Sequence, residues 1–284
     1  MMLKKILLLT GIAICLSGAA PPTNTWVAIG DSITYLNDHV DETGNRITKG
    51  YLTLITERFP DIQYINQGHN GWTSARMAEQ IESIGLVKAD VYTVFLGTNG
   101  WWHGVPVGTI EDYRQNTGAG TVNGAFRIIM DKIRSLNSSA RIILITPMQR
   151  GDFVYILMHS NNAYGSYQEK NGQSLEAFAN AILAIGKLEN IPVVDLYHES
   201  GIVQENMVNF KRLKDPHTGE YRDFKYPDFV GVPYNPQTDE YPYPVEAMNM
   251  TYDGLHPSDK GHKIIADMLT VKWEGINRMA GSKQ

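Results

Sequence analysis

Four short stretches of the sequence carry residue types that together could perform nucleophilic catalysis. A serine stands at position 32, and Asp253 and His256 lie close together near the end of the chain. A serine hydroxyl is a weak nucleophile that needs a neighbouring base, and the base needs an acid to orient it. Segments 66–73 and 97–100 are rich in glycine and amide side chains, which can donate hydrogen bonds to an oxyanion. These residue types are sufficient for acyl transfer through a covalent intermediate.

The elements that must position these residues alternate between strands and helices. Strands are expected at 26–29, 62–65, 91–96, 141–145 and 191–194, and helices at 50–59, 74–84, 122–136, 175–188 and 258–273. Nearly continuous apolar strands separated by amphipathic helices are typical of a parallel sheet covered on both faces. The pattern predicts an α/β fold: a three-layer α/β/α sandwich with a central, mostly parallel five-stranded sheet. Ligands bind at the carboxyl ends of such strands, where segments 30–33, 68–73 and 97–100 begin.

The same segments match, in order, the sequence blocks of the SGNH hydrolases, also called GDSL esterases and lipases. The matching blocks are Gly30-Asp31-Ser32-Ile33-Thr34, the glycine block from Asn66 to Thr73, Gly97-Thr98-Asn99-Gly100, and Asp253-x-x-His256-Pro257. The chain resembles this family over nearly its whole length, with isoleucine at 33 in place of leucine and Gly100 where aspartate is frequent. The resemblance implies a flavodoxin-like fold, ester hydrolysis, and no metal or organic cofactor.

The resemblance also implies a role for each matching residue. Ser32 would attack the ester carbonyl, His256 would serve as base and then acid, and Asp253 would orient the imidazole. The oxyanion hole would consist of the backbone amides of Ser32 and Gly71 and the side-chain amide of Asn99. Losing one such donor commonly costs about 3 kcal/mol of transition-state stabilisation.

Each segment taken alone has a simpler interpretation. Ser32 could cap a helix, Asn99 could occupy a left-handed turn, and segment 253–257 could be a loop before the last helix. These interpretations do not explain the order of the four blocks. Two functional alternatives stay open: a lipase, lysophospholipase or thioesterase on the same fold, and a carbohydrate-binding protein without catalytic activity.

Aromatic residues near the candidate site suggest a carbohydrate ester as substrate. Segment 209–252 is rich in proline and aromatic residues and is longer than an ordinary connection, so we expect it to cover or rim the pocket. Candidate substrate contacts are Asp31, Trp72, Trp101, Trp102, His103 and Tyr252. Aromatic faces suit sugar rings, although the same side chains could simply pack the loop. The favoured substrate is a small-molecule or polysaccharide ester of an acetyl or other short acyl group.

Residues 1–19 have the order of a secretory signal peptide, with two lysines, an apolar run at 6–16 and then small residues. The apolar run is shorter than the roughly 20 residues of a membrane-spanning helix. The residue before Cys15 is isoleucine rather than a small residue, which favours release over lipid anchoring. Residues 20–284 are then expected to form one secreted or periplasmic domain.

Charge, histidine spacing and apolar segment length argue against nucleic acid, metal and membrane partners. The formal net charge is -5, and no cluster of lysine and arginine offers a surface for phosphates, which argues against nucleic acid. The histidines lack the spacing of a metal site. Beyond the leader there is no apolar segment of membrane-spanning length, so no stable membrane span is expected. The sequence does not indicate an oligomeric state.

Overall fold

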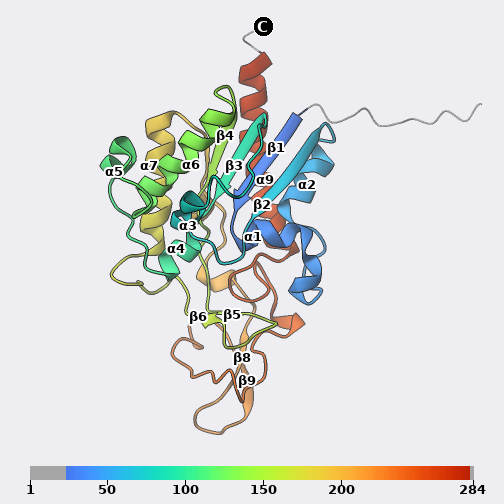
Figure 1. The fold of residues 1–284 in the computed structure, drawn as a ribbon. Coiled ribbons are helices and arrows are strands. Elements are labelled where there is room, and N and C mark those ends of the chain that lie inside the picture. Colours follow the sequence, from blue (N-terminus) through green and yellow to red (C-terminus); the bar gives the residue numbers. More distant parts are fainter. Residues whose placement is uncertain (1–23, 282–284) are drawn as a thin grey trace, which may run out of the picture.

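The computed structural model describes residues 24–281, and a parallel sheet forms its centre (Figure 1). The strands are β1 (Asn24–Gly30), β2 (Ile62–Gly68), β3 (Val91–Phe95), β4 (Arg141–Ile145) and β7 (Val193–Val194). Their order is β2-β1-β3-β4-β7, and every neighbouring pair is parallel. This arrangement confirms the predicted α/β fold with five parallel strands.

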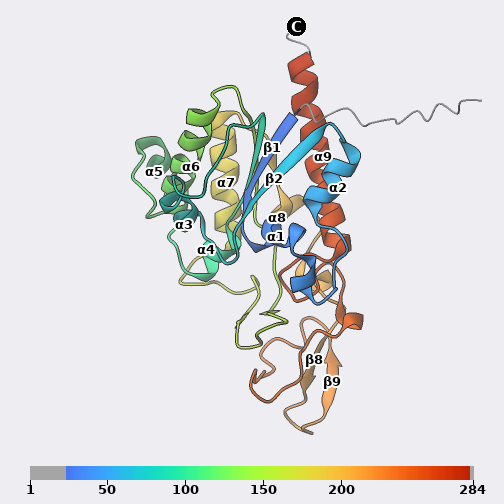
Figure 2. The same cartoon turned by 45° about the vertical axis from the view of Figure 1, so that its right-hand side comes forward.

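Helices cover both faces of the sheet, because alternate side chains of each strand point to opposite faces. In β1, Val27 and Ile29 pack into one apolar cluster, whereas Trp26 and Ala28 pack into the other. The first face is covered by α3 (Ser74–Glu79), α5 (Ile110–Gln115), α6 (Val122–Leu136) and α7 (Leu175–Glu189). The second is covered by α2 (Tyr51–Arg58), α8 (Leu196–Glu199) and α9 (Asp259–Gly281). Figures 1 and 2 show these layers from two sides.

Some elements differ in extent from the sequence-based expectation. The helix expected at 74–84 ends at Glu79, and a turn follows in which Ile81 donates its backbone N–H to Ala78. The fifth strand is shorter than 191–194, because the Ile191 N–H is bonded to a carbonyl of α7 and proline has no N–H to offer. Short 3₁₀ helices lie at Leu36–Asp38, Val40–Thr43, Gln204–Asn206 and Val245–Ala247. None of the helices between residues 24 and 281 combines the length and apolarity needed to cross a membrane.

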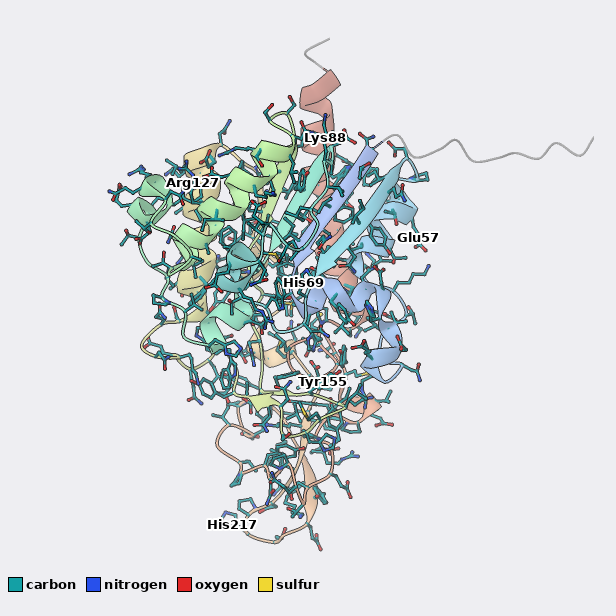
Figure 3. All side chains as sticks on the ribbon, in the orientation of Figure 1. Glu57, His69, Lys88, Arg127, Tyr155 and His217 are labelled. Atoms are coloured by element: carbon teal, nitrogen blue, oxygen red, sulfur yellow. The ribbon has the colours of Figure 1, made fainter. Side chains whose placement is uncertain are left out.

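Two β-hairpins lie beyond the carboxyl ends of the sheet strands, and the sequence pattern did not predict them. One pairs β5 (Phe153–Val154) with β6 (Asn162–Ala163), and the other pairs β8 (Lys211–Lys214) with β9 (Tyr221–Phe224). The β8–β9 hairpin extends farthest from the sheet and carries His217 at its tip (Figure 3). A separate apolar cluster joins the two hairpins and contains Val154, Val208, Leu213, Phe229, Tyr243 and Ala247. The predicted leader at 1–19, including Cys15, lies outside the described residues.

Candidate active site

Ser32 stands where β1 passes into the short helix α1 (Ser32–Tyr35). Asp31 caps this helix, since its Oδ1 accepts the backbone N–H of Ile33 at 3.0 Å. Gly30 allows the close return of the chain, because a Cβ at this position would lie 2.0 Å from Thr34 Oγ1. The Gly-Asp-Ser order therefore places the Ser32 hydroxyl at the carboxyl end of β1.

Asp253 and His256 share a tight turn just before α9. The Asp253 Oδ1 accepts the backbone N–H groups of Leu255 at 3.0 Å and of His256 at 2.7 Å. Gly254 has a φ of 89°, and a Cβ there would lie 1.8 Å from the Asp152 carbonyl oxygen. Only glycine fits this position. The turn therefore directs the carboxylate onto the imidazole three residues later.

The three side chains form one hydrogen-bonded chain. His256 Nδ1 lies 2.7 Å from Asp253 Oδ2, and His256 Nε2 lies 2.9 Å from Ser32 Oγ. A carboxylate only accepts hydrogen bonds, so the contact with Asp253 selects the tautomer in which Nδ1 carries the proton and Nε2 presents its lone pair to the serine. All three side chains are buried, and the imidazole is held between Phe153 at 5.4 Å and Tyr252 at 5.8 Å, measured between ring centroids. The arrangement allows His256 to accept the Ser32 proton.

The serine and histidine open into a cavity of about 270 Å³. It is lined by Ser32, Leu36, Asn70, Gly71, Asn99, Trp102, His103, Arg150, Phe153, Tyr155, Asn161, Ala163, Leu255 and His256. Gly71 has a φ of 71° with open space where a Cβ would project, so its backbone conformation favours glycine. Asn99, in α4 (Thr98–Trp102), donates one amide N–H to the Trp72 carbonyl at 3.2 Å. The second N–H of that amide is not used in this bond.

The cavity includes only two of the six substrate contacts expected from the sequence. Trp102 and His103 line it, whereas Asp31, Trp72, Trp101 and Tyr252 are outside its lining. Neighbouring residues on α4 point in different directions, so Trp101 is fully buried and donates its indole N–H to the Gln173 carbonyl at 2.9 Å. Trp72 stacks on His69 with a ring separation of 4.0 Å. Tyr252 packs behind the imidazole of His256.

The expectation that segment 209–252 rims the pocket is wrong, because none of its residues lines the cavity. One wall of the cavity is formed instead by the 153–163 hairpin, which consists of β5, β6 and the turn between them. Tyr155, in this hairpin, is labelled in Figure 3. Segment 209–252 supports the hairpin from behind. Tyr241 donates its hydroxyl to the Val154 carbonyl at 3.1 Å, and Tyr243 donates its hydroxyl to the Asp152 carbonyl.

Sequence reasoning missed the hairpin, although one signal was available. Residues 146–174 form a long connection that starts at the carboxyl end of β4, the edge of the sheet where ligands bind.

Comparison with known proteins identifies the family. The sequence model of the GDSL-like lipase/acylhydrolase family matches residues 28–264. The chain belongs to this family. Its members hydrolyse esters, which agrees with the chemistry that the hydrogen-bonded serine allows.

Solved structures support the same assignment. A possible lipase from Chitinophaga pinensis is 62% identical, with coverage of 89% of this chain and 99% of that one and a TM-score of 0.89. A protein from Lactobacillus plantarum is 19% identical, covering 89% and 97% of the two chains at a TM-score of 0.60. A lipase/acylhydrolase from Enterococcus faecalis is 18% identical, covering 89% and 96% at a TM-score of 0.50. The last two show the fold alone. No curated protein matches the chain.

A partly buried ion pair connects segment 209–252 of this acylhydrolase to Asp152, the residue just before the 153–163 hairpin. Lys211 Nζ lies 2.9 Å from Asp152 Oδ2, and the two side chains are 6% and 13% exposed. Lys211→Met would leave the partly buried Asp152 carboxylate without its counter-ion, so we expect unfolding free energy to fall by about 2–4 kcal/mol in urea denaturation, less than the full cost of breaking a buried pair because Gly165 and Tyr167 still donate to that carboxylate. Lys263→Met removes an exposed pair with Asp267 (67% and 47% exposed) and should cost less than about 1 kcal/mol. Equal, small losses in both variants would contradict a structural role for the Lys211 pair.

Asp31 gives the stability of the protein an unusual pH dependence. Burial raises the pKa of its carboxyl from 3.8 to about 6, outweighing the hydrogen bond from the Ile33 N–H. Between these values the folded protein binds a proton that the unfolded chain does not, so stability falls as pH rises. Asp31→Asn keeps the oxygen that caps α1 and removes the charge. We expect a gain of up to about 3 kcal/mol at high pH.

Urea denaturation of wild type and Asp31→Asn, at a pH above 7 and at a pH near 4, tests this expectation. The gain should be large at the higher pH and small at the lower one. A gain that is the same at both pH values would show that the Asp31 charge is not its cause.

Proposed function

We propose that this chain is a secreted or periplasmic serine ester hydrolase that removes acetyl or other short acyl groups from carbohydrate esters. One observation carries the proposal: the hydrogen-bonded chain from Ser32 through His256 to Asp253 ends in the wall of a cavity. Family membership supports ester hydrolysis, and the geometry supports a covalent acyl-enzyme route.

The reaction follows from the positions of these atoms. As Ser32 Oγ bonds to the ester carbonyl carbon, its proton passes to His256 Nε2, and Asp253 stabilises the resulting imidazolium. The bond to the alcohol oxygen then breaks, and His256 returns the proton to that oxygen. A water molecule deprotonated by His256 attacks the acyl-serine and releases the free acid. Asp253 stays ionised throughout.

Three hydrogen-bond donors are proposed to stabilise the tetrahedral intermediate. They are the backbone N–H groups of Ser32 and Gly71 and the side-chain amide of Asn99, and all three residues line the cavity. The Trp72 carbonyl can only accept, so its bond to Asn99 fixes which end of that amide carries the nitrogen. This contact orients the amide before substrate binds.

The cavity supports a compact acyl group and a polar alcohol. Its volume of about 270 Å³ lies just below the 300–1,000 Å³ that is usual for drug-sized ligands. Asn70, Asn161 and His103 share the lining with the aromatic rings of Trp102 and Tyr155. Such a mixture suits the hydroxyls and apolar faces of a sugar, whereas a long acyl chain needs a continuous apolar surface. The leader expected at 1–19 agrees with an extracellular polysaccharide as substrate.

A panel of esters tests the proposal. We expect kcat/KM to fall roughly tenfold or more between p-nitrophenyl acetate and p-nitrophenyl octanoate, because added methylenes no longer fit the cavity. Acetate should also be released from an acetylated oligosaccharide. A preference for the octanoyl ester would favour the lipase alternative. If folded protein hydrolyses no ester, the proposal fails and glycan binding without catalysis becomes the next function to measure.

A further inference from the structure

Arg150 is a buried cation in the wall of the catalytic cavity. It follows β4 in the chain, is 1% exposed, and belongs to the cavity lining. Its backbone is firmly held, because its carbonyl accepts the Ser166 N–H and the Gln204 side-chain amide, each at 2.8 Å. The position of this arginine in the same cavity as Ser32 is therefore set by the fold.

The guanidinium of Arg150 forms no salt bridge with any residue between 24 and 281. Its Nε and Nη2 atoms are buried and make no hydrogen bond to any residue between 24 and 281. Three carboxylates interact with this charge through space, those of Asp253, Asp152 and Asp31. Asp253 is hydrogen-bonded to the imidazole of His256, Asp152 is paired with Lys211, and Asp31 accepts the Ile33 N–H through Oδ1 while its Oδ2 makes no hydrogen bond to any described residue. A buried charge without a hydrogen-bonded counter-ion is unfavourable, and an anionic ligand in the cavity would supply one.

Aromatic rings hold the guanidinium without neutralising its charge. The central carbon lies 5.5 Å from the ring centroids of both Trp101 and Trp102 and 5.9 Å from that of Phe153. Cation–π contacts of this kind offset part of the cost of burial and orient the planar group. Burial lowers the pKa of Arg150 to about 10, so the side chain is still protonated at neutral pH.

Arg150 is the one permanently charged side chain in the described lining of the cavity, which contains no aspartate, glutamate or lysine. A desolvated cation in such a wall attracts an anion, and the guanidinium fork matches the geometry of a carboxylate. We propose that the ester substrate carries a carboxylate, which Arg150 binds within the catalytic cavity. This inference rests on the proposed function: if the acyl group is acetyl, the carboxylate belongs to the alcohol, an acidic sugar of the uronic acid type. The second position at which the substrate could carry the carboxylate is the far end of the acyl group.

Two matched substrate pairs test the inference. The first compares a methyl O-acetyl-glucuronoside with the corresponding glucoside, and the second compares monomethyl succinate with methyl pentanoate. We expect wild-type kcat/KM for the carboxylate member of one pair to be about 10- to 100-fold higher, the range of a charged hydrogen bond. The glucuronoside pair reports a carboxylate on the alcohol, and the succinate pair one on the acyl group. Equal rates within both pairs would overturn the inference.

Arg150→Met separates substrate binding from transition-state stabilisation. Methionine fills the space between the rings without charge, so the variant is expected to fold and to lose the preference for the carboxylate substrate. Arg150→Lys should keep part of it, since lysine keeps the charge but not the planar fork. Arg127→Met is the control, because Arg127 also lies over an aromatic ring, that of Tyr113, but stands on α6, away from the hairpins (Figure 3). Equal losses on charged and neutral substrates in Arg150→Met would overturn the inference.

Binding measurements keep the inference independent of catalysis. Calorimetric titration of Ser32→Ala protein should show tighter binding of the glucuronoside than of the glucoside. If the carboxylate is on the acyl group, monomethyl succinate should instead bind more tightly than methyl pentanoate. Preference in binding without any hydrolysis by wild type would support the Arg150 site while rejecting the proposed esterase. Hydrolysis without preference in either measurement would reject the Arg150 site alone.

Discussion

Replacing Ser32 with alanine is expected to lower kcat for p-nitrophenyl acetate by about 10⁵- to 10⁶-fold, the scale seen when a serine nucleophile is removed. The reason is chemical: without Oγ no acyl-enzyme forms, and His256 has no serine proton to accept. Among the described residues, the Ser32 hydroxyl has one side-chain hydrogen bond, to Nε2 of His256. The variant should therefore stay within about 1 kcal/mol of wild-type stability.

The measurement combines steady-state kinetics with a thermal unfolding curve for each protein. Ser74→Ala is a matched control, because Ser74 is also a buried serine but its hydroxyl has no hydrogen-bond partner among the described residues. It should keep wild-type activity. If Ser32→Ala retained substantial activity while remaining folded, Ser32 would not be the nucleophile.

Replacing Asp253 with asparagine is expected to lower kcat by about 10⁴-fold with little change in the fold. The asparagine oxygen can still accept the backbone N–H groups of Leu255 and His256, which keeps the turn intact. Its NH₂ group then faces His256 Nδ1 and donates to it. The imidazole proton moves to Nε2, so the ring can no longer accept the proton of Ser32.

Asp195→Asn is a close control for this change. Asp195 Oδ2 lies 2.8 Å from Nδ1 of His198, at the same spacing in the chain as Asp253 and His256. The other ring nitrogen of His198 faces Glu176 at 3.4 Å instead of a serine. We expect kcat to be unchanged in Asp195→Asn. Nitrogen NMR of the histidines should show the tautomer change at His256 in Asp253→Asn, and unaltered activity there would contradict the orienting role.

The Asp-x-x-His spacing recurs in this chain, and its copies show which contacts of the active site can be predicted from the sequence and which cannot. The Asp-x-x-His pattern occurs at 195–198, 253–256 and 259–262, but only the first two copies form a hydrogen-bonded carboxylate–imidazole contact. In the third copy the Asp259 carboxylate accepts hydrogen bonds from Thr48, and His262 Nδ1 has no hydrogen-bond partner among the described residues. Only the order of the family blocks distinguishes the second copy in the sequence. In the structure, Ser32 lies against His256, a contact between residues more than two hundred positions apart.

The sequence by itself determined the parallel α/β sheet and the family. Apolar periodicity indicates which side of a strand or helix is buried, and it can be seen within short stretches of chain. Glycines such as Gly254 are demanded by a local φ angle or a close approach, so the turns that carry the candidate residues are also visible in the sequence.

The tertiary structure alone decided which side chains form the cavity. Trp101 and Trp102 are neighbours of the same type, yet one is fully buried against α7 and its preceding loop while the other faces the cavity. Segment 209–252 supports the 153–163 hairpin instead of touching the cavity, and Arg150 enters the wall through contacts with Ser166 and Gln204. Each outcome depends on packing between segments far apart in the chain, and no local pattern of residues encodes the direction from which a distant segment arrives.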